Sequence, residues 1–291
     1  MGREPFLKVL AREVLGPEIA EKIWSRIEIL GDIALIRKPL DFDDVEALRR
    51  LGEELLKRLP YVKSVWLAIS PVRGMERVRQ YLHLAGEKKS ETIYREHGCS
   101  FVLDITKVYV SPVLGYDHIR TARMVRDGER ILNMFAGIGG YSIVISKHAK
   151  PSYVLSIDLN PYAVKYLKTN VELNRVEHLN DVVLGEAISV TSSMPREFHR
   201  VLMPLPELWR EALRAALKAV KMGGYIHPHI FVEANRRKEA FAKASQIVGE
   251  ELRSLGAMHR IVGGHVIRSV GPRKYHVVLD IVIENLRKEL C

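Results

Sequence analysis

The sequence has little cysteine and no long hydrophobic run. Only two cysteines occur among 291 residues, Cys99 and Cys291, and they stand far apart in no metal-binding spacing. A disulfide framework and a zinc site are therefore not expected, and a reducing compartment is the default. No apolar run approaches the roughly 20 residues that a membrane span needs, and the N-terminus lacks the apolar core of a secretory signal. We expect a soluble, cytoplasmic protein with no metal and no membrane partner.

Acidic residues are also scarce relative to basic ones. The chain has 45 Lys and Arg against 35 Asp and Glu, which gives a formal net charge of +10 and a pI near 9.5. This balance favours a polyanionic partner such as a nucleic acid. The charged surface of a heat-tolerant protein would give the same balance, so charge alone does not decide between them. No internal repeat or low-complexity tract is visible.

Residues 130–161 carry the pattern around which the chain is organised. A short apolar run at 131–136 turns through three glycines into an amphipathic segment, and a second apolar run at 153–157 ends on Asp158. Glycines let the backbone approach a ligand, and a helix that follows them offers free N–H groups. A carboxylate at the end of the second strand can accept both hydroxyls of a ribose. This order of elements predicts a site for an adenosine.

The spacing of the glycines disfavours a dinucleotide. A dinucleotide fingerprint reads G-x-G-x-x-G with its third glycine inside the helix, whereas residues 137–142 read GIGGYS. The motif A-G-x-G, followed by an acid at the end of the next strand and then by Asn160 and Pro161, looks like the S-adenosylmethionine site of the class I methyltransferases. The alternative is a parallel-sheet core in which the glycines only make tight turns.

Strands and helices continue to alternate after Asp158. This alternation predicts an α/β fold, a Rossmann-like doubly wound sheet that holds its ligand at the carboxyl ends of the strands. The expected elements are a helix at 161–174, strands at 181–184 and 200–206, a helix at 207–221, a strand at 225–232, a helix at 236–255, and a terminal antiparallel pair at 259–270 and 275–284.

The first part of the chain mixes strands and helices in another order, which predicts a separate, smaller α+β domain. Apolar spacing at 7–25 is broken near Gly16-Pro17 and allows a helix pair or a partly ordered arm. A hairpin is expected at 27–38, a helix from a capping box at Asp43 and Glu46 to Leu59, a strand at 62–69 and a hairpin at 91–110. The expected segments are a helical arm at 1–27, an RNA-facing α+β domain at 28–110, a linker helix at 111–125 and the catalytic domain at 126–291.

The linker segment carries polar residues next to the glycine turn. Asp117, His118 and Arg120 are the candidates for contact with a substrate. The alternative is that these three side chains only cap and solvate the helix.

With these residues placed, the chain resembles the archaeal and eukaryotic tRNA (guanine-N1)-methyltransferases that act on guanosine 37, beside the anticodon. A sister family shares most of the same motifs, namely the wybutosine-pathway enzymes that transfer the aminocarboxypropyl group of S-adenosylmethionine. The likeness runs from about residue 28 to the C-terminus. It rests on AGE at 85–87, ETIYREHG at 91–98, LDITKVYVSP at 103–112, MFAGIGGYSI at 134–143, IDLNPYAVKYLKTNVELNRV at 157–176, VLMPLP at 201–206 and KYHVVLDIVI at 274–283.

The resemblance implies a set of cofactor-binding residues for S-adenosylmethionine. Asp158 would hold the ribose, and Glu186 would lie near the adenine. The remaining residues of this set are Phe135, Ala136, Gly137, Leu159 and Met203.

The resemblance also implies catalytic and substrate-binding residues. In the family an acid after the Ser-Pro pair is proposed to take the proton from guanine N1, and Asp117 stands at that position. Guanine N1–H is a weak acid, so attack on the sulfonium methyl needs a well-placed carboxylate, and a cation near O6 would stabilise the developing charge. Arg77 or Arg79 resembles the family's arginine with that role, and the gapless spacing favours Arg77. The expected substrate-binding residues are Arg79, His118, Arg120 and Pro204.

Several positions depart from the family's pattern. Pro204 stands where the family usually has an Asn that is thought to contact the target guanine, and proline has neither an N–H nor an amide side chain. Either another group reads the base or the substrate differs. Val113 replaces a usual basic residue, Asn133 replaces a usual Asp, and Asp117 is one methylene shorter than the usual Glu. Many members carry a small N-terminal domain that touches the tRNA elbow, and we expect that domain to be absent or reduced here.

Three functions therefore stay open. The first is methyl transfer from S-adenosylmethionine to N1 of guanosine 37 by a monomer that binds the tRNA anticodon stem-loop. The second is aminocarboxypropyl transfer from the same cofactor to the wybutosine precursor at position 37. The third is a tRNA-binding module without catalysis, which Pro204 and Val113 would suggest.

Overall fold

The computed structural model describes residues 4–40, 42–71, 74 and 77–287. The chain divides into two compact units, residues 1–110 and 111–291. Within the described residues, no helix combines the length and the apolar character that crossing a membrane requires.

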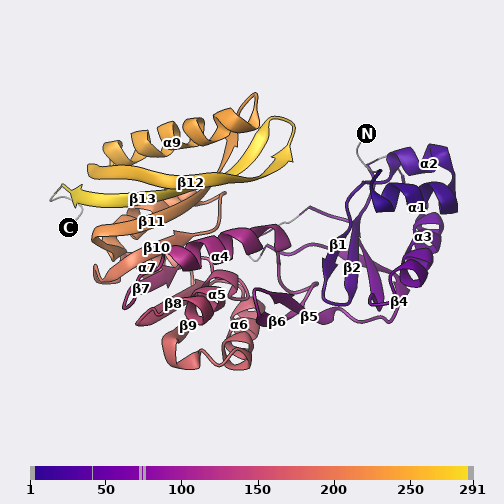
Figure 1. Ribbon diagram of the computed structural model, residues 1–291, viewed down its shortest axis with the longest axis horizontal. Coiled ribbons are helices and arrows are strands. Elements are labelled where there is room, and N and C mark those ends of the chain that lie inside the picture. Colours follow the sequence, from indigo (N-terminus) through magenta and orange to yellow (C-terminus); the bar gives the residue numbers. More distant parts are fainter. Residues whose placement is uncertain (1–3, 41, 72–73, 75–76, 288–291) are drawn as a thin grey trace. The chain divides into compact units, whose positions relative to one another are not determined.

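In the first unit, helices pack on one face of a four-stranded sheet (Figure 1). The sheet has the order β1-β2-β3-β4, in which β2 and β3 are parallel and the other neighbours are antiparallel. Its strands are β1 (Glu28–Leu30), β2 (Ile33–Arg37), β3 (Ser64–Ala68) and β4 (Tyr81–Gly86), and its helices are α1 (Phe6–Leu15), α2 (Pro17–Lys22) and α3 (Val45–Arg58). The strand β4 was not predicted from the sequence.

The local chemistry of the first unit explains where its elements begin and turn. Gly16 adopts a φ of 84° and Pro17 is the first residue of α2, so the segment is a helix pair. The N-cap of α3 is Asp44, which accepts a hydrogen bond of 2.9 Å from Ala47 N. The predicted capping box at Asp43 was therefore wrong by one residue, and Asp43 instead forms an ion pair with Lys38.

A separate hairpin completes the first unit. It consists of β5 (Glu91–Glu96) and β6 (Cys99–Asp104), which pair in register from Glu91 opposite Asp104 to Glu96 opposite Cys99. The two turn residues, His97 and Gly98, both have positive φ, 47° and 73°, as a two-residue type I′ turn requires. This confirms the predicted hairpin.

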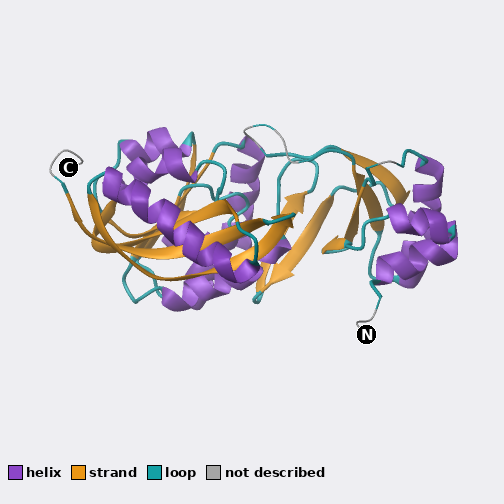
Figure 2. Cartoon of the chain, turned by 90° about the horizontal axis from the view of Figure 1, so that it is seen from above, coloured by secondary structure: helices purple, strands orange, loops and turns teal. Residues whose placement is uncertain are grey.

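The second unit contains a seven-stranded sheet with helices on both faces (Figure 2). Its order is β12-β13-β11-β10-β7-β8-β9; the strands from β11 to β9 are parallel neighbours, and β13 is antiparallel to β11 and β12. The strands are β7 (Arg130–Asn133), β8 (Tyr153–Asp158), β9 (Asn180–Leu184), β10 (Phe198–Met203), β11 (Val220–Glu233), β12 (Ala257–Gly271) and β13 (Lys274–Leu286). The predicted α/β fold with a doubly wound sheet is confirmed.

The helices of the second unit follow the predicted alternation, with one addition. They are α4 (Gly115–Met124), α5 (Gly140–His148), α6 (Pro161–Leu173), α7 (Ala187–Ser192), α8 (Trp209–Ala219) and α9 (Arg237–Ser254), together with short 3-10 turns at Pro112–Leu114 and Glu177–Leu179. The short helix α7 was not predicted. The helix α4, which lies in the segment expected as a linker, packs on α5 within the second unit. The division into four segments stays a prediction.

Among the residues that the structure describes, the outermost strand, β12, pairs only with β13. The pairing shifts register at four points, namely between Met258 and His259, Ile261 and Gly263, Val266 and Arg268, and Ser269 and Gly271. Such bulges bend a strand and interrupt its ladder.

Candidate active site

Three parallel strands of the second unit end at the same edge of the sheet. β7 ends at Asn133, β8 at Asp158 and β10 at Met203, and β7 lies between the other two. Because ligands of doubly wound sheets bind at the carboxyl ends of such strands, this edge is the candidate active site.

The glycine loop after β7 is tied to the end of β8 through one carboxylate. Gly137 N donates a hydrogen bond of 2.6 Å to Asp158 Oδ2, and Asn160 N donates one of 2.9 Å to Oδ1. Gly137 has a φ of 55°, and a Cβ placed there would meet no atom within 4 Å, so the loop faces open space. A carboxylate oxygen can accept more than one hydrogen bond, so an acid at this strand end suits a ribose with two hydroxyls.

The other two glycines of the loop make room for neighbouring helices. A Cβ on Gly139 would lie 2.3 Å from Leu167 Cδ1 on α6, and a Cβ on Gly140 would lie 2.5 Å from His118 Cε1 on α4. His118 is buried against this loop and its ring lies edge-on to Tyr141, with 4.3 Å between the ring centroids. The close packing of α6 and α4 therefore explains why both positions are glycine, and no phosphate of a ligand is needed to explain them.

The remaining expected cofactor residues have protein contacts of their own. Ala136 N bonds to Ile157 O at 2.9 Å, Phe135 and Leu159 are half-buried, and the side chain of Met203 belongs to the hydrophobic core. Glu186 is the N-cap of α7 and accepts hydrogen bonds from Ile188 N and Ser189 N at 2.9 and 2.7 Å. Burial opposes ionisation of Glu186, but these donors lower the pKa of its carboxyl group. Contacts of these residues with a cofactor stay predictions.

Asp117 is enclosed by four side chains, which come from the helices α4 and α5 and from the strands β11 and β12. Its Oδ1 accepts a 2.7 Å hydrogen bond from Arg120 Nε and lies 3.5 Å from His265 Nδ1 on β12. Its Oδ2 accepts a hydrogen bond from the hydroxyl of Tyr141 on α5 and lies 3.6 Å from His229 Nε2 on β11. Asp117 is only 1% exposed, so any group that approaches it must displace one of these neighbours.

This enclosure lies close to the end of β10. Met203 pairs with Pro228 of the parallel strand β11, and His229 is the next residue of that strand. Because His229 contacts Asp117, the carboxylate lies in the neighbourhood where β10 ends and Pro204 begins. The structure thus brings the predicted residues Asp117, His118 and Pro204 to the same edge of the sheet as the glycine loop.

Asp117 is held in its ionised form. Burial favours the neutral acid, but the Arg120 cation and the hydrogen bonds from Arg120 and Tyr141 lower the pKa of Asp117 below its ordinary value. Burial raises the pKa of Tyr141 well above its ordinary value, so the hydroxyl stays protonated and donates. The Tyr141 oxygen then accepts from His229 Nε2 at 3.0 Å, and His229 Nδ1 accepts from His276 Nε2 at 2.9 Å.

On its other side, Asp117 continues into a buried chain of charges through Arg120. The Arg120 guanidinium donates two hydrogen bonds to Asp280 on β13, at 2.6 and 3.1 Å. His227 Nδ1 donates to Asp280 Oδ1 at 2.8 Å, because His227 Nε2 accepts from Arg200 at 2.7 Å. Arg200 in turn bonds both oxygens of Glu129, at 3.0 and 3.2 Å. The predicted substrate residue Arg120 is thus committed to two carboxylates in this structure.

The histidines of this network were missed in the sequence analysis. The strand 225–232 was predicted, and it contains the triplet His227-Pro228-His229. Side chains two residues apart in a strand point to the same face, so this alternation was a usable indication of a polar cluster. Nothing local to Asp280 or Tyr141 indicated that they join it.

Arg77 and Arg79 belong to the first unit. Both guanidinium groups lie 5.5 Å from the centroid of the Tyr109 ring. Arg77 has a φ of 54°, which is uncommon for a residue other than glycine. Their roles toward a substrate stay predictions.

Comparison with known proteins adds the family and its chemistry. Residues 92–253 match the TRM5/TYW2 methyltransferase domain. The chain is 43% identical to a tRNA 4-demethylwyosine(37)-methyltransferase of Saccharolobus solfataricus, over 90% of this chain and 95% of the relative. It is 31% identical to a tRNA (guanine(37)-N(1))-methyltransferase of Pyrococcus abyssi, over 90% of this chain and 76% of the relative. It is 28% identical to a tRNA(Phe) (4-demethylwyosine(37)-C(7)) aminocarboxypropyltransferase of Methanocaldococcus jannaschii, over 88% of this chain and 97% of the relative.

Solved structures agree with these relatives. The crystal structure of Trm5b from Pyrococcus abyssi has a TM-score of 0.83 and 30% identity, and the match covers 98% of this chain and 82% of that chain. The Pyrococcus horikoshii TYW2 structure in complex with MeSAdo has a TM-score of 0.75 and 25% identity, covering 97% of this chain and all of the other. That ligand agrees with the predicted cofactor, S-adenosylmethionine. The protein is thus a member of the TRM5/TYW2 methyltransferase family, as predicted.

Proposed function

We propose that this protein transfers the methyl group of S-adenosylmethionine to the base at position 37 of tRNA, and that this base is 4-demethylwyosine. The observation that carries the proposal is the 43% identity, over nearly the whole length of both chains, with a relative named for that reaction. The prediction of N1 of guanosine 37 shares the cofactor, the transferred group and the position in tRNA, and differs in the base.

The glycine loop and Asp158 would hold the cofactor. The Asp158 carboxylate already fixes Gly137 N and Asn160 N and would accept the ribose hydroxyls as well. We assign Phe135, Ala136 and Leu159 to the walls around the nucleoside, Glu186 to the side of the adenine and Met203 to the end of β10. S-adenosylmethionine supplies an electrophilic methyl group, so the protein must present a nucleophilic atom of the base to it.

Asp117 would accept the proton that the base loses. It is ionised, it lies near the end of β10, and its orientation is fixed by Arg120 and Tyr141. A carboxylate held in this way needs little reorganisation when it takes up a proton. Of the four side chains around it, His265 is the most exposed, at 25% against 17% for Arg120, so an incoming nucleobase would displace His265 most easily. We assign Arg77 to the developing negative charge, and Arg79, His118 and Arg120 to the support of the substrate.

Pro204 supports a tricyclic base over guanine. An Asn at this position would offer both a donor and an acceptor to a guanine edge, whereas proline offers only an apolar ring. An apolar ring at the end of β10 suits a larger aromatic surface, because that contact depends on area and shape and needs no paired hydrogen bonds.

Two other transfers have support of their own. The ionised Asp117 would serve N1 of guanosine 37 equally well, and the relative from Pyrococcus abyssi carries that activity in its name. Aminocarboxypropyl transfer is supported by the relative from Methanocaldococcus jannaschii. Both use S-adenosylmethionine and position 37, so product analysis has to separate them.

The test is to incubate the protein and S-adenosylmethionine with two tRNA substrates that differ only at position 37, one with guanosine and one with 4-demethylwyosine. The tRNA is then digested to nucleosides, which are separated, and the mass of each is measured by mass spectrometry. We expect one added methyl group on 4-demethylwyosine, and little on guanosine. Methylation of guanosine alone would support the second candidate, and a gain of the larger aminocarboxypropyl group would support the third. No product with either tRNA would contradict all three.

A further inference from the structure

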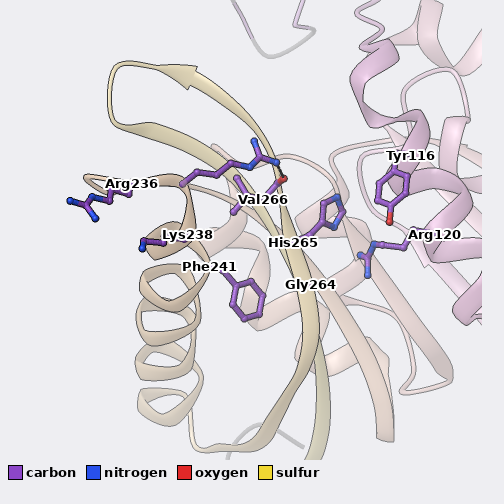
Figure 3. A pocket seen from close by; sticks show the side chains of 9 residues that line it. Tyr116, Arg120, Arg236, Lys238, Phe241, Gly264, His265 and Val266 are labelled. Carbon is purple, nitrogen blue, oxygen red and sulfur yellow. Dashed lines mark hydrogen bonds between the residues drawn. The ribbon is translucent and has the colours of Figure 1, made fainter.

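A pocket of about 910 Å³ in the second unit follows the outer edge of β12, with α9 on one side and α4 on the other. Figure 3 shows Arg236, Lys238 and Phe241 on the α9 side and Tyr116, Arg120 and His265 on the α4 side. Nothing in the cofactor site described above uses this pocket.

The charge of the pocket is of one sign. Four of its nine lining residues are Arg or Lys, and none is Asp or Glu. A lining of one charge is not common to all pockets of this protein. A pocket in the first unit combines Lys89 and Arg95 with Asp32 and Glu91. The lining of the β12 pocket therefore favours an anionic ligand, whereas the mixed charges of the other pocket do not.

Two of the four cations are available for a ligand. Arg120 is bound to Asp117 and Asp280, and Arg237 donates a 2.5 Å hydrogen bond to Val266 O on the edge of β12. Arg236 and Lys238 are exposed, and neither forms an ion pair with any residue in the described part of the chain. Both residues line the pocket at the N-terminal end of α9, and in Figure 3 their charged ends lie on the side away from His265 and Tyr116.

The pocket also offers an aromatic surface next to Asp117, the residue proposed to accept the proton. Tyr116 is 64% exposed, and the edge of its ring meets His265 with 5.4 Å between the centroids. Tyr116 precedes Asp117 in the chain, and both His265 and Arg120 contact that carboxylate. A strand of nucleic acid that brings one nucleobase to Asp117 can therefore continue over the residues of this pocket.

We propose that the β12 pocket binds the RNA strand next to the modified nucleotide, with phosphates at Arg236 and Lys238 and a neighbouring base stacked on Tyr116. Phosphate contacts from Arg and Lys position an RNA, and stacking on an aromatic side chain holds an unpaired base without reading its sequence. This inference rests on the proposed function, because it takes tRNA as the substrate.

The first test measures the affinity of the whole protein for an anticodon stem-loop, without S-adenosylmethionine, at several salt concentrations. The variant Arg236→Ala/Lys238→Ala should bind roughly tenfold more weakly at about 0.15 M salt, with a salt dependence that is less steep by about 1.4, since each single-strand phosphate contact contributes about 0.7. The matched control is Arg214→Ala/Lys218→Ala on the exposed face of α8, which removes the same charge outside the pocket. Equal losses in the two variants, or none in either, would overturn the proposal.

The second test locates the phosphates. One backbone phosphate at a time is replaced by a neutral methylphosphonate in the stem-loop. At a position next to nucleotide 37, this should weaken binding to the parent but not to Arg236→Ala/Lys238→Ala, because the contact is already lost. If the phosphates whose replacement has this effect lie only in the stem, the inference is contradicted. Tyr116→Ala should weaken binding, and Tyr116→Phe, which keeps the ring, should not.

These readouts separate the two proposals. A parent protein that binds no stem-loop would remove both the tRNA function and this pocket's role. A parent that binds the stem-loop, with a pocket variant that binds equally well, would remove only the pocket's role. Neither readout requires that methyl transfer occurs.

Discussion

Tyr141 on α5 donates a hydrogen bond to Asp117 on α4, and both side chains are buried, at 4% and 1% exposure. Tyr141 follows the glycine loop directly, so this bond links the loop to the helix that precedes the sheet. The same oxygen of Tyr141 accepts from His229, so three elements meet at one hydroxyl group.

Replacing Tyr141 by Phe tests whether this hydroxyl sets the proton affinity of Asp117. Without the donor, the pKa of Asp117 should rise, because one of the groups that stabilise its ionised form is lost. The rate of methyl transfer should then begin to fall at a higher pH as the solution is acidified. Single-turnover rates measured across a pH series check this.

The control for Tyr141→Phe is the affinity for S-adenosylmethionine, which should not change because the hydroxyl faces Asp117 and His229. The variant should lose about 1–3 kcal/mol of stability, since a buried donor on His229 is left without its acceptor. A pH–rate profile that overlays the parent's would separate Tyr141 from the chemistry.

Asp158→Asn should weaken binding of S-adenosylmethionine by at least roughly tenfold, because a charged acceptor of hydrogen bonds is replaced by a neutral one. An amide also has only one acceptor oxygen, so it cannot hold both Gly137 N and Asn160 N. Isothermal titration calorimetry measures the affinity. Asp181→Asn on β9 is the matched control and should bind normally. Within the described residues, the Asp181 carboxylate accepts a side-chain hydrogen bond only from the hydroxyl of the half-buried Tyr153.

Gly140→Ala should destabilise the protein by about 1–3 kcal/mol, because the new methyl group would stand 2.5 Å from His118 Cε1. The clash involves the His118 side chain, so Gly140→Ala should reduce stability clearly less when His118 is already replaced by Ala. Urea unfolding of the four proteins gives this coupling energy. Strictly additive effects would show that α4 does not pack on the glycine loop as described.

Stability should fall as the pH is lowered from about 7.5 to about 5, because the network contains buried neutral histidines. Burial lowers the pKa of His229 from 6.5 to about 4, so between these values the unfolded chain binds a proton that the folded chain excludes. At pH 5 this single residue should cost about 2 kcal/mol. The groups that face it are Asp117, Arg120, His118, Tyr141, His227 and His276.

Unfolding in urea at the two pH values measures the effect, and His229→Gln should reduce it. The carboxylates do not account for it, because Asp117 and Asp280 have lowered pKa values and lose their contribution only below the ordinary value of 3.8. A stability that is equal at pH 5 and pH 7.5 would contradict the assignment of His229 as a neutral group.

The strand, glycine turn, helix and strand of residues 130–161 could be predicted because their pattern is local. Buried apolar runs, three glycines and an acid at a strand end lie within 32 residues, and each has a direct structural meaning. The elements that were missed have weak local patterns. The helix α7 reads AISVTS, in which β-branched residues and serines disfavour a helix, and it starts because Glu186 caps it.

The polar network could not be predicted because it depends on strand order. Arg120 and Asp280 are 160 residues apart in sequence, and they meet because β13 lies between β11 and β12 in the sheet. The sequence identified Asp117 and Arg120 as polar candidates, but it could not show that their partners are other protein groups. Only the register of the strands places His227, His229 and Asp280 under α4.

The bulged edge strand β12 has a consequence for how copies of this protein behave at high concentration. An exposed edge of fifteen residues would ordinarily serve as a template on which another chain could add a strand. Four interruptions in the ladder, and an arginine that occupies the Val266 carbonyl, leave no long flat stretch for such growth. The same irregular backbone that shapes the basic pocket should thus protect the protein against fibrillar self-association.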